Sequence, residues 1–200
     1  MAADPVRCGW AQSKNPRMVA YHDTEWGVPV SDDRTLFEFM VLESAQAGLS
    51  WEVVLNKREG YRAAFHGFDP EKVTAMTEED VARLCTDASI IRNAQKIRAS
   101  IKNAQAFLRV AKEWGSFAAY QWSWTENVPV ANHWKTGAEV PAITPLALAM
   151  SKDLKKRGFS FLGPTVWYAH LQATGVVNDH TVNCFRHREV TGLIPKVPTR

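Results

Sequence analysis

Four residues of the types that bind metal ions lie near the two ends of this 200-residue chain. Cys8 and His22 lie near the N-terminus, and His180 and Cys184 lie near the C-terminus. Two thiolates and two imidazoles form a complete tetrahedral ligand set for a structural zinc ion. His180 and Cys184 are four residues apart, which places both on one face of a helical turn, whereas Cys8 and His22 match no compact zinc-finger spacing. Two buried thiols and two unrelated histidines are the alternative that spacing leaves open.

A second chemical feature is a carboxylate in apolar surroundings. Glu43 directly follows the apolar run 40–42 on a predicted helix, where a charge is costly unless it is paired. The chain also has eight tryptophans, and clustered indole rings form either core or a flat stacking surface for a planar ligand. Glu43 is therefore either a binding group or a structural carboxylate bonded to an arginine or to the backbone.

A third feature is a stretch of positive charge in a chain whose net charge is only +3. Residues 88–112 contain no Asp or Glu and carry six Lys or Arg, and they follow an acidic segment at 78–80. A helix, a short apolar hairpin and a basic second helix over about 77–112 match the plan of a helix-hairpin-helix, whose backbone N–H groups hold DNA phosphates. An ordinary pair of helices with a solvated basic face is the alternative.

The elements that must position these groups are predicted to be helices. Asp32 or Asp33 can begin a helix with Leu36 and Met40 on its inner face, and Ser50 can begin another that carries Tyr61. Further helices are predicted from Pro70, after a capping box at 77–80, along a long segment after a turn near 88–91, over 151–157 and from Pro164. The long helix carries Ile97, Ile101, Ala104 and Leu108 on one face. Residues 122–145 are expected to be irregular. Strand-like alternation is nearly absent, so we expect an all-α protein with a single domain over 1–200.

Composition limits the classes of protein that the chain can belong to. Hydrophobic residues make up 46% and charged residues 22%, which excludes a disordered or fibrous chain. Three cysteines cannot form a disulfide framework, and an odd number suits thiols or metal ligands in a reducing compartment. No apolar run approaches the ~18–20 residues of a membrane span, and residues 1–5 have no signal-peptide core. We expect a soluble, cytoplasmic protein with no membrane partner.

Several local strings together resemble the bacterial 3-methyladenine DNA glycosylase I family. The likeness runs from about Arg7 to Cys184, nearly the whole chain, and the strings are specific as a set although each is weak alone. They are Arg7-Cys8-Gly9-Trp10, Tyr21-His22-Asp23, Glu25-Trp26-Gly27-Val28-Pro29, Leu42-Glu43, Gln46-Ala47-Gly48-Leu49-Ser50-Trp51, Lys57-Arg58-Glu59, Lys155-Lys156-Arg157-Gly158-Phe159 and Val177-Asn178-Asp179-His180.

This resemblance implies an all-α helix-hairpin-helix DNA glycosylase fold in which a zinc-binding element joins the terminal segments at about 7–30 and 164–186. The family's ligands for one structural Zn²⁺ fall on Cys8, His22, His180 and Cys184. Its base-binding residues fall on Trp10, Tyr21, Trp26, Glu43 and Trp51, with Glu43 and Tyr21 as the catalytic pair.

The implied activity is hydrolysis of the N-glycosidic bond of N3-methyladenine in double-stranded DNA, leaving an abasic site and free 3-methyladenine as product. Methylation at N3 makes the purine cationic and a good leaving group. Glu43 would accept hydrogen bonds from the exocyclic amine and a protonated ring nitrogen, and Tyr21 would complete them. A cationic ring gains about 0.5–2 kcal/mol against an indole face. Unmodified adenine lacks the charge, so the carboxylate would exclude it.

The expected DNA contacts come from two short segments. Leu49, in an apolar break that contains Gly48, is the candidate wedge for the gap left by the extruded nucleotide, and a turn packed on the core is the alternative. The hairpin contacts are expected at Ser89, Ile90, Ile91, Arg92 and Lys96. Ser89 departs from the glycine associated with this family at that position, which bears on hairpin geometry and DNA affinity.

Other features point to a simple monofunctional enzyme. Many relatives in the superfamily carry an Asp beyond the hairpin, but the segment 112–114 here offers only Glu113. No lysine is placed as a Schiff-base nucleophile, so strand cleavage is not expected. We expect a monomer. A non-catalytic module that recognises damaged DNA, and a zinc enzyme acting on a small molecule, are the competing interpretations.

Overall fold

The computed structural model describes residues 4–197, which are mostly helical. The bounds of the elements in the first half of the chain are η1 Gly9–Ala11, α1 Pro16–Thr24, α2 Asp33–Gln46, α3 Trp51–Asn56, α4 Arg58–Ala64, η2 His66–Phe68, α5 Pro70–Thr74 and α6 Glu78–Leu84. Those in the second half are α7 Ala94–Trp114, α8 Phe117–Ser123, β1 Val130–Ala131, η3 Gly137–Glu139, α9 Pro145–Lys156, α10 Pro164–Ala173, β2 Val177–Asn178 and α11 Phe185–Val190.

Helix α2 lies at the centre of the molecule and contacts α3, α7, α8 and α10. The two acidic residues at its start have different tasks. Asp32 is the N-cap and accepts from the backbone N–H of Thr35 at 2.8 Å. Asp33 accepts instead from the backbone N–H groups of Phe117 and Ala118, at 2.9 and 2.8 Å, so it fixes the start of α8 against α2. This cross-link orients the helix that carries Glu43.

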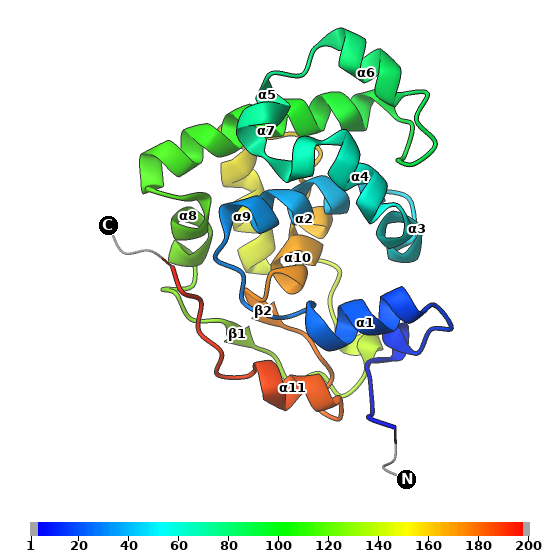
Figure 1. Cartoon of the computed structure of the whole chain (residues 1–200). Helices are drawn as coiled ribbons and strands as arrows, with labels where there is room; N and C mark the ends of the chain where they lie inside the picture. The colour runs from blue at the N-terminus through cyan, green and yellow to red at the C-terminus, as the bar shows by residue number, and fades with distance from the viewer. Residues whose placement is uncertain (1–3, 198–200) are drawn as a thin grey trace.

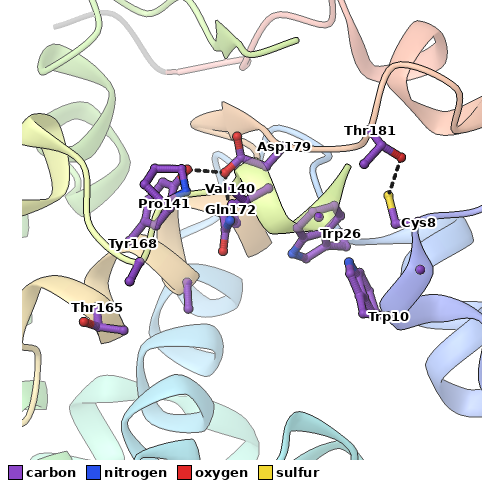
Figure 2. A pocket seen from close by; sticks show the side chains of 14 residues that line it. Cys8, Trp10, Trp26, Val140, Pro141, Thr165, Tyr168, Gln172, Asp179 and Thr181 are labelled. Atoms are coloured by element: carbon purple, nitrogen blue, oxygen red, sulfur yellow. Dashed lines mark hydrogen bonds between the residues drawn. The ribbon is translucent and has the colours of Figure 1, made fainter. Parts of the chain in front are cut away.

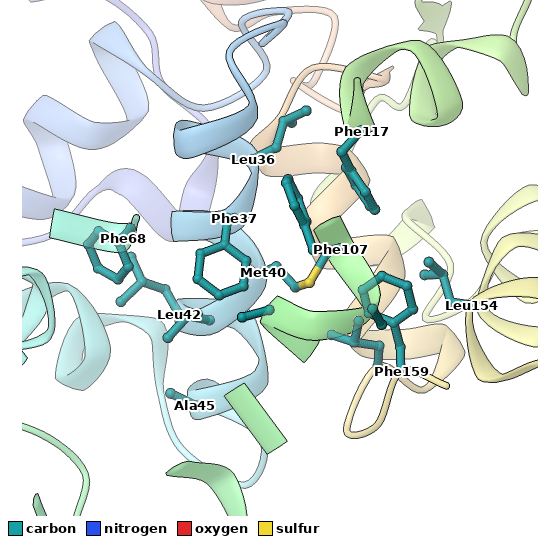
Figure 3. Close-up of a cluster of buried hydrophobic side chains, with 14 of the residues drawn as sticks. Leu36, Phe37, Met40, Leu42, Ala45, Phe68, Phe107, Phe117, Leu154 and Phe159 are labelled. Carbon is teal, nitrogen blue, oxygen red and sulfur yellow. The ribbon is translucent and has the colours of Figure 1, made fainter. Parts of the chain in front are cut away.

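The main hydrophobic core lies between α2, α7, α8, α9 and α10 (Figure 3). Phe107 and Phe117 stack at 4.2 Å between ring centroids, and Phe37 meets Phe107 edge-on at 5.3 Å. A second apolar cluster joins α1, α2 and the terminal segments, and its members are Cys8, Met18, Tyr21, Trp26, Phe39, Leu55, Ala173 and Cys184. The first cluster gives the fold a rigid centre, and the second surrounds the groups singled out for chemistry.

The expected basic second helix is α7, which follows α6 after the turn at residues 85–93 (Figure 1). Thr77 and Asp80 form the predicted capping box at the start of α6, and Asn93 caps α7. The turn packs closely on α4, because a Cβ added to Gly60 would lie 2.3 Å from the carbonyl oxygen of Ser89. A helix, a turn and a basic helix are therefore present in the expected order.

The terminal segments meet on one side of the molecule, where α1 and α11 are drawn in blue and red (Figure 1). The two-residue strands β1 and β2 pair in parallel, with Val130 opposite Val177 and Ala131 opposite Asn178. This pairing connects the otherwise irregular region before α9 to the loop that carries His180. In residues 4–197 no helix combines the length and apolar character that crossing a bilayer requires.

Two details of the predicted helices are wrong, and one short sheet was not predicted. The helix after Ser50 breaks at Lys57, so Tyr61 lies on α4 and not on the helix that Ser50 begins. Helix α9 begins at Pro145, six residues before the predicted start, because Thr144 caps it and proline suits the first helical position. The short β1–β2 sheet was not predicted, since two-residue strands carry no alternation that the sequence could display.

Candidate active site

A cavity of about 160 Å³ lies where the N-terminal segment meets α2, α3 and α10. This volume is far above the ~10–15 Å³ that a single water molecule needs. The residues that line it are Trp10, Tyr21, Trp26, Glu43, Gln46, Trp51, Ala169 and Gln172. All five residues expected to bind a base are among them, so the fold brings together groups that are spread over 42 positions of the sequence.

The aromatic walls of this cavity are held by one another. Trp51 is the first residue of α3, where the Ser50 cap fixes its backbone, and its ring lies 5.2 Å from that of Tyr21. Trp10 meets Trp26 edge-on at 5.1 Å between ring centroids. Trp26 and Tyr21 are buried, whereas Trp10 is 40% exposed. An exposed indole at the rim and buried rings behind it leave flat apolar surface open to an entering planar ligand.

Two buried carboxylates on α2 have opposite surroundings. Glu38 accepts from the guanidinium groups of Arg58 and Arg62 at 2.7 and 2.8 Å, as buried charges usually must. Glu43, 4% exposed, faces the cavity, and its Oε2 atom has no hydrogen-bond partner within residues 4–197. The structure thus favours a binding role for Glu43 over the structural alternative of an arginine-bonded carboxylate.

Burial raises the pKa of Glu43 from its ordinary value of 4.5 to about 8. Without a charged partner, this side chain is therefore largely in its neutral form at neutral pH. A cationic ligand in the cavity would lower that pKa and stabilise the carboxylate. Burial also raises the pKa of the Tyr21 hydroxyl, and the nearby Glu43 adds to the effect, so Tyr21 remains a neutral phenol that can donate or accept a hydrogen bond.

The four residues proposed as metal ligands converge in a second buried cluster. The ligand atoms of Cys8, His22, His180 and Cys184 all lie within 4.8 Å of one another. Three sulfur–nitrogen distances are 3.5 Å (Cys8–His180), 3.4 Å (Cys184–His22) and 3.6 Å (Cys184–His180). Tetrahedral zinc, with Zn–S about 2.3 Å and Zn–N about 2.0–2.1 Å, separates sulfur and nitrogen ligands by about 3.5 Å. The donor set and its spacing both fit a zinc ion.

The second ring nitrogen of each histidine also has a partner. Nδ1 of His22 lies 2.7 Å from Asp23 Oδ1, and Nε2 of His180 lies 3.0 Å from the carbonyl oxygen of Trp26. These acceptors fix the tautomers that leave His22 Nε2 and His180 Nδ1 directed at the cluster. Arg7 in turn holds Asp23 through a hydrogen bond of 2.7 Å. Sequence reasoning missed the roles of Asp23 and Arg7, although both lie in the strings that carry the family resemblance.

The residues expected to contact DNA lie on two surface segments. Leu49 is 41% exposed in the turn after α2, where Gly48 has a φ of +82°. Ser89 and Arg92 are exposed in the turn before α7. Ile90 is 1% exposed, so its side chain belongs to the core and only its backbone can serve a contact. The backbone N–H of Ile91 donates to the Tyr61 hydroxyl at 3.2 Å.

Lys96 has a more specific place than the sequence indicated. Its ammonium group donates to the carbonyl oxygens of Ala45 and Ala47, at 2.8 and 2.7 Å. These carbonyls lie at the C-terminal end of α2, where a positive charge is favourable. Lys96 therefore connects the basic helix α7 to the segment that carries Leu49. Glu113, in contrast, is exposed, pairs with Arg157 at 2.7 Å and does not line the cavity.

Two cavity residues, Ala169 and Gln172, lie in no motif that sequence reasoning could have weighted, and Gln46 lies in the resemblance string 46–51 but was not expected to line the cavity. Gln172 also lines a neighbouring cavity of about 440 Å³ between α10 and the loop at residues 137–142 (Figure 2). The two cavities also share three other lining residues, Trp10, Trp26 and Ala169. The only sequence signal for Gln172 is its place one turn after Tyr168 and Ala169 on the same face of a predicted helix.

Comparison with known proteins places this geometry in a family. The family model described as methyladenine glycosylase matches residues 10–187. The chain is 52% identical to DNA-3-methyladenine glycosylase 1 of Escherichia coli K12 over 178 residues, covering 89% of this chain and 95% of that protein. It is 43% identical to DNA-3-methyladenine glycosylase of Haemophilus influenzae over 179 residues, covering 90% and 96%.

Solved structures agree with these sequence matches. A crystal structure of 3-methyladenine DNA glycosylase I superposes with a TM-score of 0.87 at 49% identity, covering 90% of this chain and 98% of the other. A second, which addresses 3-methyladenine recognition by the Staphylococcus aureus glycosylase I, has a TM-score of 0.84 at 38% identity, covering 86% and 92%. The mostly helical fold is thus that of a known group of enzymes, and the chain belongs to the methyladenine glycosylase family.

Proposed function

We propose that this protein excises 3-methyladenine from alkylated DNA as a monofunctional glycosylase, hydrolysing the N-glycosidic bond and leaving an abasic site. The observation that carries the proposal is the unpaired, buried carboxylate of Glu43 in a cavity walled by tryptophans. A group so costly to bury is retained where a ligand supplies its partner. The membership of the chain in the methyladenine glycosylase family supports the same substrate.

The target nucleotide must first leave the double helix, because the cavity lies behind the protein surface. Unstacking costs a few kcal/mol, and stacking on aromatic side chains recovers about 1–3 kcal/mol per base. Trp51, with Trp10 and Trp26, supplies the aromatic surface. Leu49, exposed on the turn beside the cavity, fills the space left in the helix. Lys96 donates to the backbone carbonyl oxygens of Ala45 and Ala47 and so fixes the segment that leads to Leu49.

The cavity selects a base by its charge. N3-methyladenine in DNA is cationic, so it provides both a cation for the indole faces and the missing partner of Glu43. Binding the cation favours the ionised form of Glu43, whereas neutral adenine leaves the buried group without compensation. Exclusion of the abundant normal base is therefore part of the same electrostatic arrangement that binds the lesion.

The cavity supports hydrolysis without strand cleavage. The positive charge already makes the methylated base a good leaving group, so strong acid catalysis is unnecessary. The carboxylate of Glu43 and the hydroxyl of Tyr21 hold the departing base. No lysine lies among the residues that line the cavity, so the described part of the chain offers no amine there for a Schiff base with the sugar.

The cysteine and histidine cluster serves the site indirectly. When bound by Cys8, His22, His180 and Cys184, a zinc ion has four protein ligands and no open position, so it contributes structure and not reaction chemistry. Tyr21 directly precedes His22 in the sequence, and Trp10 lies two residues after Cys8. The cluster therefore fixes one wall of the cavity. Phosphate contacts by the turn at residues 85–93, where Ser89 and Arg92 are exposed, complete the proposed DNA-binding surface.

The test is to incubate DNA methylated at adenine N3 with the purified protein and to measure free 3-methyladenine by chromatography. We expect release of the base and alkali-sensitive abasic sites, with no strand breaks before alkali treatment. Glu43→Gln is the matched control, because it preserves shape and removes the charge. Binding of damaged DNA without release of any base would support the non-catalytic recognition module instead.

A further inference from the structure

Asp179 is a buried carboxylate that forms no ion pair with an arginine or lysine among residues 4–197. It is 3% exposed and accepts hydrogen bonds from four side chains. Its Oδ1 atom accepts from Asn132 Nδ2 and Trp134 Nε1, each at 2.7 Å. Its Oδ2 atom accepts from the Tyr168 hydroxyl and, at 2.7 Å, from Gln172 Nε2. Four donors compensate the buried charge, and one of them belongs to a residue of the base cavity.

The carboxylate fixes which end of the Gln172 amide faces the cavity. The two ends of a carboxamide have nearly the same shape, so its direction is decided by hydrogen-bond partners. Both Asp179 oxygens already accept hydrogen bonds from other donors, so turning the amide around would bring two acceptor oxygens into contact. Nε2 of Gln172 is therefore held on Asp179, so Oε1 is the end of the amide turned away from that carboxylate, and Gln172 is one of the residues that line the base cavity.

The cavity consequently presents two acceptors, Glu43 and the Gln172 carbonyl oxygen. On the base-pairing and major-groove edges, adenine has N–H donors only on its N6 amine, which carries two hydrogens. Methylation at N3 adds none. A purine with oxygen at C6 places an acceptor at the same position. An adenine derivative can thus donate one N6 hydrogen to Glu43 and the other to the Gln172 carbonyl oxygen, so both acceptors of the cavity have a partner.

We propose that Gln172 is a specificity-determining residue, whose oxygen accepts a hydrogen bond from the N6 amine, and that Asp179 is the positioning residue that aims it. This inference rests on the proposed function and deepens it. Charge selects the alkylated base through Glu43, and the fixed amide selects a 6-amino over a 6-oxo purine. A 6-oxo purine would place its oxygen against the Gln172 oxygen, and two buried acceptors in contact strongly disfavour binding of that purine.

Asp179→Asn tests the positioning role because it reverses the amide. Trp134 Nε1 can only donate, so the oxygen of the new side chain stays on the side of Trp134 and Asn132. Its NH₂ group then faces Tyr168, whose hydroxyl can accept, and Gln172. To accept from that NH₂, the Gln172 amide turns around and directs its own NH₂ into the cavity. The variant is therefore expected to prefer an oxygen at C6.

The experiment measures dissociation constants of the full-length protein for free 3-methyladenine and 3-methylhypoxanthine, which carries oxygen at C6, by tryptophan fluorescence. We expect the wild type to prefer 3-methyladenine, and Asp179→Asn to reduce the preference about tenfold or more. Gln172→Leu should weaken 3-methyladenine binding about tenfold without improving 3-methylhypoxanthine binding. Tyr168→Phe is the matched control: it removes one donor from the same carboxylate but leaves Gln172 held, so the preference should not change.

An unchanged preference in both Asp179→Asn and Gln172→Leu overturns the inference. If Asp179→Asn does not fold, Gln172→Leu decides alone, because that substitution leaves three donors on Asp179. Release of 3-methyladenine from methylated DNA by the wild type is measured in parallel. If the wild type releases 3-methyladenine from DNA but the variants keep the wild-type base preference, the role of Gln172 is refuted and the proposed function stands. If the wild type releases no base from DNA, the proposed function itself is refuted.

Discussion

Replacing Glu43 by Gln should stabilise the protein while removing its activity. Glutamine has the shape of the neutral carboxyl but cannot ionise. The pKa of Glu43 is about 8 in the folded protein, against 4.5 when the side chain is unperturbed. Between pH 4.5 and pH 8 the native state therefore binds one proton that the unfolded state has lost. Stability therefore falls as pH rises through this range. At 1.36 kcal/mol for each pH unit, burial of Glu43 costs about 3 kcal/mol at pH 7 and about 5 kcal/mol above pH 8.

Thermal unfolding of both proteins in the absence of DNA measures this cost. For a protein of this size, 1 kcal/mol corresponds to roughly 2–4 °C in Tm, so Glu43→Gln should unfold roughly 6–12 °C above the wild type at pH 7. By the same arithmetic the difference should shrink to roughly 1–3 °C at pH 5 and increase toward pH 8.5. Comparison with the parent at each pH cancels the titration of all other groups. A Tm difference that does not depend on pH, or a variant less stable than the wild type at pH 8.5, would refute the reasoning.

Three further outcomes are expected. Cys184→Ala should lower the Tm because the proposed metal site loses one of its four ligands. Base release per folded molecule, measured after removal of unfolded protein, should persist. Loss of chemistry without loss of stability would point to a catalytic metal. Leu49→Ala should slow base release from double-stranded DNA but leave free 3-methyladenine binding unchanged, and equal turnover by the two proteins would remove the wedge assignment. Gly60→Ala should weaken DNA binding in a titration, because its Cβ would lie 2.3 Å from the Ser89 carbonyl oxygen and displace the turn, whereas binding of the free base should not change.

The helices that the sequence predicts well are those with a local start signal. Asp32, Thr77 and Pro164 each begin a helix where capping or proline chemistry expects one, because these signals act within a single turn. The role of Asp33 could not be predicted in the same way. It satisfies backbone N–H groups at the start of α8, 84 residues away, and only the packed structure brings those groups together.

The candidate site shows the same division. Glu43 could be recognised as a candidate site residue because burying a carboxylate in an apolar segment costs free energy unless the carboxylate has a partner. The sequence could not distinguish its surroundings from those of Glu38, five residues earlier on the same helix, because the partners of Glu38 come from α4. Asp179 and Gln172 were missed for a related reason: a hydrogen bond between a loop and a helix, with two further donors from the irregular region before α9, leaves no periodic pattern.

The clustering of Cys8 and His22 with His180 and Cys184 has a consequence for when the protein becomes competent during its synthesis. Ribosomes make the N-terminal segment first, so Trp10, Tyr21 and Trp26 emerge long before the residues that anchor them. A nascent or prematurely terminated chain that lacks the last twenty or so residues has the central helices but no fixed aromatic wall. The aromatic wall of the cavity can thus be completed only after the C-terminal segment that carries His180 and Cys184 has been made.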